Sequence, residues 1–187
     1  MAENLFFDPT QLKHCGKNVI IGKTVRIRHP EKVSIGDNVI IDDFCYITGE
    51  VEIGDYVHIG NGCTISASAN KITFGPFCGV AAGTKIYGAS SNYIKCALDL
   101  PTIPKDYVYD TIRGDVVCER FVLLGANCVV TPGVHIPEGC AFSAGLLVGK
   151  SMRLKPWSLI CDNQGSLIPR SGVKSLLERV EQFYTFE

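Results

Sequence analysis

The chain has 187 residues, with 18 lysines and arginines against 19 aspartates and glutamates. This length suits one domain with a sizeable core, and a net charge of -1 gives no electrostatic case for a nucleic-acid or membrane-surface partner. The first residues lack a basic segment followed by a long apolar run, and no 18-residue apolar stretch occurs. We therefore expect no secretory signal, no membrane span and a cytoplasmic location.

A six-residue repeat follows an N-terminal segment of residues 1–14. Isoleucine recurs at positions 35, 41, 47, 53, 59 and 65, and the frame also covers Cys15 to Ile27, Phe74 to Ile86 and Cys118 to Val148. The 18 repeats make about six coils if three repeats form one turn. Because one repeat buries almost nothing alone, stacked coils must form the core, and we expect an all-β parallel solenoid over residues 15–170.

The cysteines follow the same frame. No two of the nine are closer than ten residues, so the sequence does not favour a zinc site built from C-x-x-C pairs. We expect Cys96 and Cys161, which lie off the frame, to be more exposed. The other seven occupy inward positions, where free cysteine behaves as a small hydrophobe: Cys15, Cys45, Cys63, Cys78, Cys118, Cys128 and Cys140.

The repeat is interrupted by a loop at residues 87–117, which contains the stretch YGASSNY and the prolines Pro101 and Pro104. A loop this long inside a compact domain is usually functional or disordered. Its composition favours an ordered arm that passes over a site. Asn92 could bond a ligand hydroxyl there, or it could stabilise the loop as an Asx turn.

Residues 171–187 carry apolar side chains at 173, 176, 177, 180 and 183, a helical stripe. Ser171 is placed to cap this helix. We expect the helix to pack on the end of the solenoid and to cover the open edge of the last coil.

The segments IGDNVIIDDFCYITG, IGDYVHIGNGCTI and LLGANCVVTPGVHIPEGCAFSAGLLVGKSM resemble the hexapeptide-repeat acyltransferases over about residues 15–170. The resemblance implies a left-handed parallel β-helix, a homotrimer with sites at the subunit interfaces, acetyl-CoA as the acyl donor, and no metal. The loop resembles the branch of sugar O- and N-acetyltransferases of lipopolysaccharide, other surface-polysaccharide and deoxysugar assembly. That branch implies a sugar or nucleotide-linked sugar as the acceptor.

The resemblance also implies which residues form the site. His58, in EVEIGDYVHIG, is our first candidate for the general base or a cofactor contact, although it could also be a corner histidine bonded to the backbone. Glu50 stands where the branch has the glutamate of a His-Glu pair, with Gly49 in place of the histidine. His135 is a third candidate. His14 and His29 are expected at the surface.

Substrate contacts are expected from Ser91, Asn92 and Tyr93. Two of them, Ser91 and Asn92, replace a pair of aspartates in the branch. The pantetheine arm of coenzyme A is expected against small residues, and its phosphates beside a basic cluster that is alternatively a solvated end of the chain. The cofactor set is Gly125, Ala126, Ser143, Ala144, Gly145, Lys150, Arg153 and Lys155.

Two rival functions share this fold. A γ-type carbonic anhydrase needs three zinc-binding histidines at subunit interfaces, whereas His58 and His135 are 77 residues apart with no third histidine clustered near either. A non-catalytic scaffold or assembly subunit would need neither the long loop nor the basic C-terminal residues. We therefore predict an acetyltransferase, with O- and N-acetylation both open.

Overall fold

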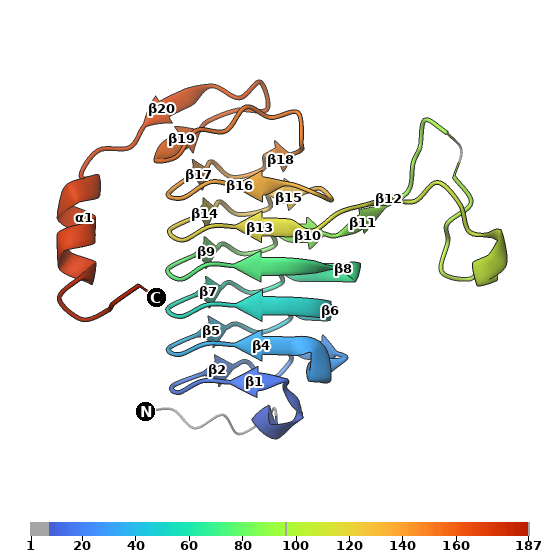
Figure 1. Ribbon diagram of the computed structural model, residues 1–187, viewed down its shortest axis with the longest axis horizontal. Helices are drawn as coiled ribbons and strands as arrows, with labels where there is room; N and C mark the ends of the chain where they lie inside the picture. Colours follow the sequence, from blue (N-terminus) through green and yellow to red (C-terminus); the bar gives the residue numbers. More distant parts are fainter. Residues whose placement is uncertain (1–7, 96, 187) are drawn as a thin grey trace.

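The computed structural model describes residues 8–95 and 97–186. Cys96 lies outside the described residues, so the expectation that it is exposed stays a prediction. The described chain forms a parallel β-helix whose coils stack along one axis, with a long arm on one side and a helix on the other (Figure 1). The chain winds with a left hand as it climbs the stack, as the family resemblance implied.

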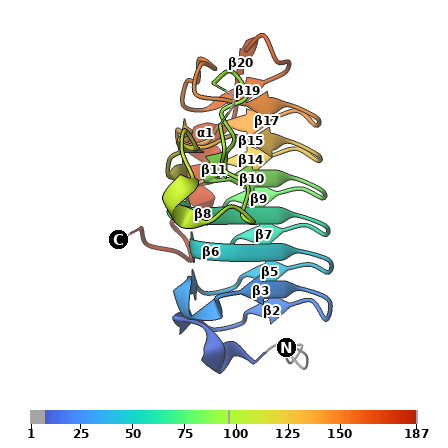
Figure 2. The ribbon, with the colours of Figure 1, turned by 90° about the vertical axis from the view of Figure 1, so that its right-hand side faces the viewer.

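Three faces build the prism, and each consists of short strands stacked in parallel (Figure 2). Two long strands bend across two faces, β6 (Tyr46–Ile53) and β8 (Thr64–Phe74). The first face adds β1 (His14–Cys15), β4 (Val33–Ile35), β13 (Val116–Cys118) and β16 (His135–Ile136). The third face adds β3 (Arg26–Arg28), β10 (Lys85–Tyr87), β15 (Val129–Val130) and β18 (Leu147–Val148).

The second face shows the number of coils most directly, because each coil contributes one strand to it. Seven parallel strands stack there, one more than the six coils that the repeat count gave. The extra coil arises because Leu154 and Ile160 continue the six-residue step beyond Val148. The strands are β2 (Ile20–Ile21), β5 (Ile40–Ile41), β7 (His58–Ile59), β9 (Gly79–Val80), β14 (Leu123–Leu124), β17 (Ala141–Phe142) and β19 (Ser158–Ile160).

The register of these strands confirms the repeat frame. On the second face Ile41 pairs with Ile59, Ile59 with Val80, and Val80 with Leu124, and the other faces stack their aliphatic residues in the same way. These side chains are almost completely buried and form one core. Stacking identical positions of successive coils therefore buries what no single repeat can bury.

The cysteines lie where the frame predicted, and six of the seven inward ones are buried. The structure adds a polar role: five thiols donate to a backbone carbonyl of the next coil, as in Cys45 to Gly60 at 3.2 Å and Cys78 to Glu119 at 3.1 Å. Burial raises the pKa of the Cys78 thiol to about 12. Such thiols stay protonated at neutral pH and are poor nucleophiles.

The three edges of the prism differ in character. The aromatic edge joins the first and second faces and carries Tyr56, Phe77, Phe121 and Trp157 in left-handed backbone conformation. The glycine edge joins the second and third faces and has Gly62, Gly83, Asn127 and Gly145 at the equivalent left-handed positions, with Phe44 below them. The arm edge joins the third face to the first, and there the repeat slips after Ile27, Ile65 and Ile86.

The arm leaves this edge through an antiparallel pair of short strands, β11 (Ala89–Ser90) and β12 (Ile112–Arg113). One 3₁₀ helix lies within the arm, η3 (Lys105–Tyr107), and two others lie near the N-terminal coils, η1 (Pro9–Gln11) and η2 (Pro30–Lys32). The arm projects well beyond the stack of coils (Figure 1).

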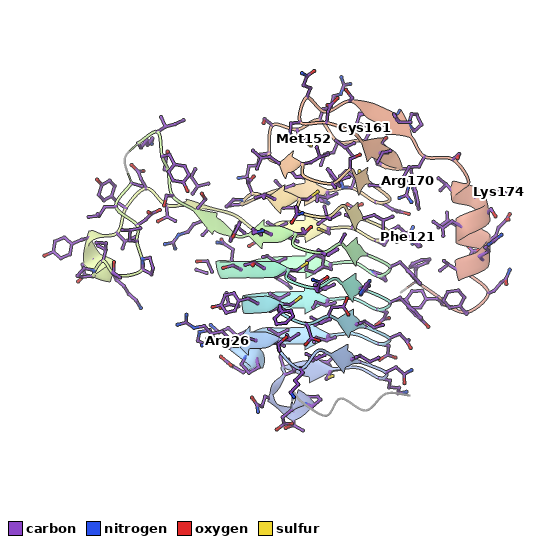
Figure 3. The ribbon with its side chains drawn as sticks, turned by 180° about the vertical axis from the view of Figure 1, so that it is seen from behind. Arg26, Phe121, Met152, Cys161, Arg170 and Lys174 are labelled. Carbon is purple, nitrogen blue, oxygen red and sulfur yellow. The ribbon has the colours of Figure 1, made fainter. Side chains whose placement is uncertain are left out.

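The C-terminal segment departs from our expectation. The last coil is covered by β20 (Leu167–Pro169), which pairs antiparallel with β19, and not by the helix. Helix α1 (Val173–Val180) begins after Gly172, with no capping bond from Ser171, and lies along the side of the stack. The chain then runs beside the aromatic edge, on the side of the molecule where Figure 3 labels Phe121.

Aromatic rings hold this segment in place. Tyr56 stacks on Phe77 with ring centres 4.9 Å apart, and Phe77 stacks on Phe121 at 5.1 Å. Tyr184 packs edge-on against Phe77 at 5.0 Å and donates its hydroxyl to Asp55 at 2.8 Å. The expectation failed because a helical stripe indicates which face of a helix is buried but not the surface that buries it. No helix within the described residues is long and apolar enough to cross a membrane.

Candidate active site

A groove of about 530 Å³ runs along the second face at the glycine edge. Apolar and small residues make most of its lining, including Gly79, Ala81, Ala82 and Leu123. His58 lies in the lower part of the groove, and Gly125 lies two coils above it on the same side. The groove therefore joins the first candidate base to the first candidate cofactor residue.

His58 is held by the strand ladder and by one carboxylate. It is the outward-facing residue just before the buried Ile59 of β7, and its Nε2 lies 2.9 Å from Oδ2 of Asp42. Both side chains are about half exposed, 58% for His58 and 43% for Asp42. The alternative interpretation of His58, as a corner histidine whose ring bonds the backbone, does not match this geometry, because the ring contacts a carboxylate.

The small residues of the expected cofactor set do come together at the glycine edge. Gly125 packs so closely on the next coil that a Cβ there would lie 2.6 Å from the carbonyl oxygen of Phe142 and 2.7 Å from the nitrogen of Ala144. The N–H of Gly145 donates to the carbonyl of Ala126 at 2.8 Å. At Gly145 itself a Cβ would meet no atom within 4 Å, so the backbone is open to a ligand on that side.

The basic residues of the set do not join this cluster within one chain. Lys150 lies over Gly133 and near Gly114, at the arm edge. The carbonyl of Lys155 accepts the Cys140 thiol, which places that residue near the aromatic edge, and Arg153 lies between the two. The sequence grouped these three because they are close along the chain, but one coil carries them around the prism.

His135 has the same local geometry as His58 on another face. It is the outward residue just before Ile136 on the first face, and its Nε2 lies 2.7 Å from Oε1 of Glu119. The other oxygen of Glu119 accepts the backbone N–H of Glu138 at 2.8 Å. His58 and His135 therefore do not converge within one chain.

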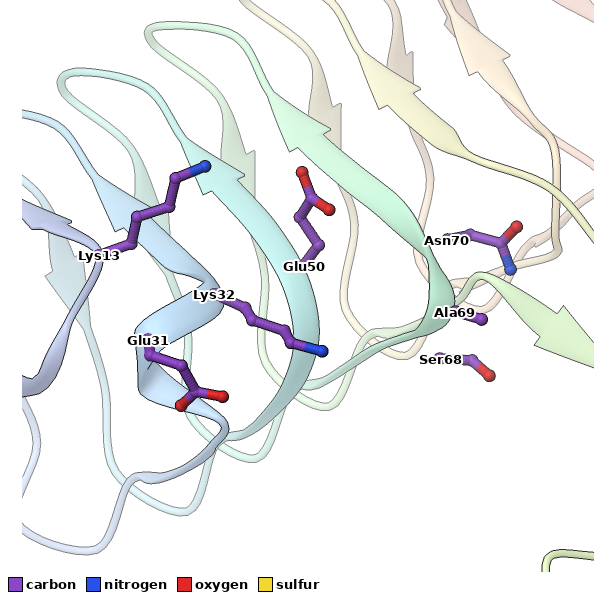
Figure 4. A pocket seen from close by; sticks show the side chains of 7 residues that line it. All are labelled: Lys13, Glu31, Lys32, Glu50, Ser68, Ala69 and Asn70. Atoms are coloured by element: carbon purple, nitrogen blue, oxygen red, sulfur yellow. The ribbon is translucent and has the colours of Figure 1, made fainter.

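Glu50 lies at the arm edge, in a separate pocket of about 260 Å³ (Figure 4). Two lysines, Lys13 and Lys32, line this pocket with it, together with Glu31, Ser68 and Asn70. The structure thus places Glu50 and His58 on different edges of the same chain. They could meet only if one of them came from a neighbouring subunit.

The arm encloses the largest described pocket, about 720 Å³, between its own loop and the arm edge. Ser91 lines it and donates to Asp99 at 2.7 Å. Arg113 and Lys105 add positive charge, and Leu100 and Pro101 add apolar surface. This mixture of cations and apolar surface fits a ligand that has both an anionic and a flat apolar part.

The other two residues expected to bind substrate lie differently. The side chain of Asn92 accepts the backbone N–H of Lys95 at 3.3 Å, so it forms the Asx-type turn that was its alternative interpretation. Tyr93 is 84% exposed at the tip of the arm. Neither lines the arm pocket of its own chain.

Sequence reasoning missed Asp42, although the coil length contains the signal. One coil is about 18 residues, so the position 16 residues before an outward histidine lies at the corner of the coil below and within reach of its ring. No group of three or more His, Cys, Asp or Glu side chains placed to hold a metal ion occurs in the parts of the chain that the structure describes.

Comparison with known proteins identifies the family. Residues 32–67 match the model of the bacterial transferase hexapeptide (six repeats). The chain is 30% identical over 147 residues to the dTDP-4-amino-4,6-dideoxy-D-glucose acyltransferase of Escherichia coli, which covers 74% of this chain and 76% of that enzyme.

Solved structures agree. The N-acyltransferase AntD from Bacillus cereus, in complex with dTDP and 3-hydroxybutyryl-CoA, superposes with a TM-score of 0.85 at 30% identity, over 96% of this chain and 97% of AntD. A hexapeptide-repeat acetyltransferase from Vibrio cholerae O1 biovar eltor, complexed with acetyl-CoA, shares the fold with a TM-score of 0.55 at 18% identity, over 90% and 81% of the two chains. The chain belongs to the hexapeptide-repeat acyltransferases, in the branch that contains AntD.

Proposed function

We propose that this acyltransferase moves an acetyl group from acetyl-CoA to a hydroxyl or amine of a nucleotide-linked sugar, in deoxysugar or polysaccharide biosynthesis. The relatives support this acceptor, because the E. coli enzyme is named for a dTDP-linked amino sugar and AntD has been crystallised with dTDP-4-amino-4,6-dideoxyglucose and coenzyme A. They favour an amine over a hydroxyl as the acceptor group.

One observation carries the proposal: His58 and Gly125 line the same groove. The small residues above His58 leave backbone N–H and C=O groups accessible to the amide-rich pantetheine arm. With the arm lying along Gly125, Ser143 and Gly145, the thioester reaches the lower groove, where His58 is the side chain that can accept a proton.

The chemistry is one addition and one elimination. The acceptor nitrogen or oxygen attacks the thioester carbonyl and forms the new bond to carbon while its proton passes to His58. The tetrahedral intermediate then expels the sulfur of coenzyme A, and His58 returns the proton to that thiolate. The products are an acetylated sugar nucleotide and free coenzyme A, and His58 ends as it began.

The acceptor is placed in the arm pocket. Arg113 and Lys105 suit a diphosphate, and Leu100 and Pro101 suit a pyrimidine base. Ser91, which lines the same pocket, is placed to bond a sugar hydroxyl. Tyr93 and Asn92 belong to the outer surface of the arm, and we assign them to the contact with a neighbouring subunit.

This arrangement requires more than one copy of the chain. The donor groove is on the glycine edge and the acceptor pocket is on the arm edge, and these two edges flank the third face. A neighbour that sets its arm edge against the glycine edge would complete a site, and repeating that contact three times closes a ring. Exposed apolar residues on the arm, among them Ile94, Leu100 and Tyr107, support such a contact.

The same assembly gives Glu50 and the basic cluster a role. Both Glu50 and Lys150 lie on the arm edge, so each would approach the donor groove of the adjacent subunit. Lys150 would then face the phosphates of coenzyme A across the interface. His135, on the first face, lies outside both grooves and is left out of the proposed machinery.

The test is transfer from acetyl-CoA to dTDP-4-amino-4,6-dideoxyglucose, followed by thiol release. We expect His58→Ala to lower kcat by roughly 10²- to 10⁴-fold, the usual contribution of a general base, while His14→Ala serves as a matched surface control with unchanged kcat. Light scattering checks that both variants keep the assembly of the unaltered enzyme. Near-normal turnover by His58→Ala would remove His58 from the role of base.

A further inference from the structure

We propose that Asp42 is the positioning residue of the reaction, because it fixes which nitrogen of His58 acts as the base. The inference rests on the proposed function and deepens it. It begins from one bond, the 2.9 Å contact between Nε2 of His58 and Oδ2 of Asp42.

A carboxylate can only accept hydrogen bonds, so the nitrogen that faces it must carry the proton. Neutral His58 is therefore the tautomer with hydrogen on Nε2, and its basic lone pair is on Nδ1. Within the described residues, Nδ1 makes no hydrogen bond. Asp42 thus leaves the basic nitrogen free for the acceptor proton, as the third member of a catalytic triad does for its histidine.

The pair is held by backbone as well as by side chains. The N–H of Asp42 donates to the carbonyl of Ile59 at 2.8 Å, and the N–H of His58 donates to the carbonyl of Cys78 at 3.1 Å. These bonds belong to the parallel ladder that pairs Ile41 with Ile59. The carboxylate and the ring are therefore carried by a rigid scaffold and not by a flexible loop.

Charge gives Asp42 its second effect. Among the described residues that line the groove, Asp42 and His58 are the only ionisable side chains, and Asn61 is the only other polar one. When His58 takes the proton it becomes a cation, and the adjacent carboxylate stabilises that cation. The effect acts on the intermediate state more than on the bound donor, so it should appear in kcat and not in KM.

The second acid–histidine pair of the chain provides the control. Glu119 and His135 repeat the same separation of 16 residues at 2.7 Å, but they lie on the first face and line neither groove. The repeat produces this pairing wherever a histidine precedes a buried aliphatic residue above an acid. What distinguishes Asp42 is the groove in which its histidine lies.

The experiment compares Asp42→Asn, Asp42→Glu and Glu119→Gln in the full-length enzyme, with acetyl-CoA and the dTDP-linked amino sugar. We expect Asp42→Asn to lower kcat on the order of 10- to 100-fold, part of what the base itself contributes, with KM for acetyl-CoA changed by less than about twofold. Asp42→Glu should restore part of the rate, and Glu119→Gln should leave it unchanged.

Nitrogen-15 spectra of the imidazoles provide a readout that a merely structural role would not move. The unaltered protein should show His58 protonated on Nε2, and Asp42→Asn should shift it towards a mixture of tautomers, because an amide can either donate or accept. A predominant Nδ1–H tautomer in the unaltered protein would overturn the inference. So would a rate for Asp42→Asn within about twofold of normal.

The failures are distinguishable. An inactive His58→Ala variant beside a fully active Asp42→Asn variant would overturn the role of Asp42 alone. A fully active His58→Ala variant would remove both residues from the mechanism, and an unaltered enzyme that transfers no acetyl group would overturn the proposed function with them.

Discussion

The aromatic edge and the glycine edge have the same backbone and opposite surfaces. On both, the residue three positions after the buried aliphatic one has left-handed geometry, with φ of 62° at Phe77 and 69° at Gly62, and donates its N–H to the coil below. On the aromatic edge, side chains at these positions stack and are covered by the C-terminal segment. On the glycine edge the positions are nearly bare, and the groove of His58 opens beside them.

The difference shows how a uniform solenoid divides its surface into structural and functional parts. Bulky residues in left-handed geometry cost about 1–2 kcal/mol each, and ring stacking with burial offsets that cost on the aromatic edge. Glycine avoids the cost and leaves the backbone accessible. Phe44 marks the boundary, because it has the same geometry on the glycine edge but is 71% exposed.

The largest effect should come from breaking the aromatic stack. Phe77→Ala removes the ring that contacts Tyr56, Phe121 and Tyr184, and we expect a loss of about 2–3 kcal/mol in the free energy of unfolding, measured in urea. Phe44→Ala, at the equivalent position without the stack, is the matched control and should change it by less than about 0.5 kcal/mol. Equal losses would mean that stacking does not offset the strained geometry.

A second change converts one edge towards the other. A Cβ at Gly62 would meet no atom within 4 Å, so Gly62→Tyr should fold with a loss of about 1 kcal/mol while its ring covers part of the donor groove. We expect KM for acetyl-CoA to rise about tenfold, equivalent to about 1.4 kcal/mol. Gly62→Asn is the control, because Asn127 already occupies this position one coil pair above. An unchanged KM would place the donor elsewhere.

The smallest effect tests the bond that holds the C-terminal segment against the aromatic edge. Tyr184→Phe keeps the ring and removes the 2.8 Å hydrogen bond to Asp55, which should lower the free energy of unfolding by about 1 kcal/mol. Tyr107→Phe, on an exposed residue of the arm, should have no measurable effect. If both variants unfold at the same urea concentration as the unaltered protein, the segment is held by the rings alone.

Much of this molecule could be predicted from the repeat. The step of six residues gave the buried column of isoleucines, the inward cysteines and the position of the arm, because each depends on neighbours one coil away. The same step grouped Gly125 with Ser143 and set His58 outward. The residues that it misplaced, Lys150 and Arg153, were grouped by closeness along the chain, and a coil separates such residues around the prism.

The aromatic edge could not be predicted, for a physical reason. Left-handed positions are usually signalled by glycine, asparagine or aspartate, so Tyr56, Phe77 and Phe121 gave no sign of their geometry. Their partners also come from the far end of the chain, 129 residues away in the case of Tyr184 and Asp55. A contact at that separation leaves no periodic trace in a sequence.

That contact gives the solenoid a polarity. A stack of coils is stabilised only between neighbours, so either end can fray without disturbing the middle. Here the C-terminal segment reaches back to Asp55 and Tyr56 in the third coil, and so the upper coils are closed into a loop that cannot be peeled off one at a time. The two lowest coils lie outside that loop, and unfolding therefore has one natural starting point, at the N-terminal end.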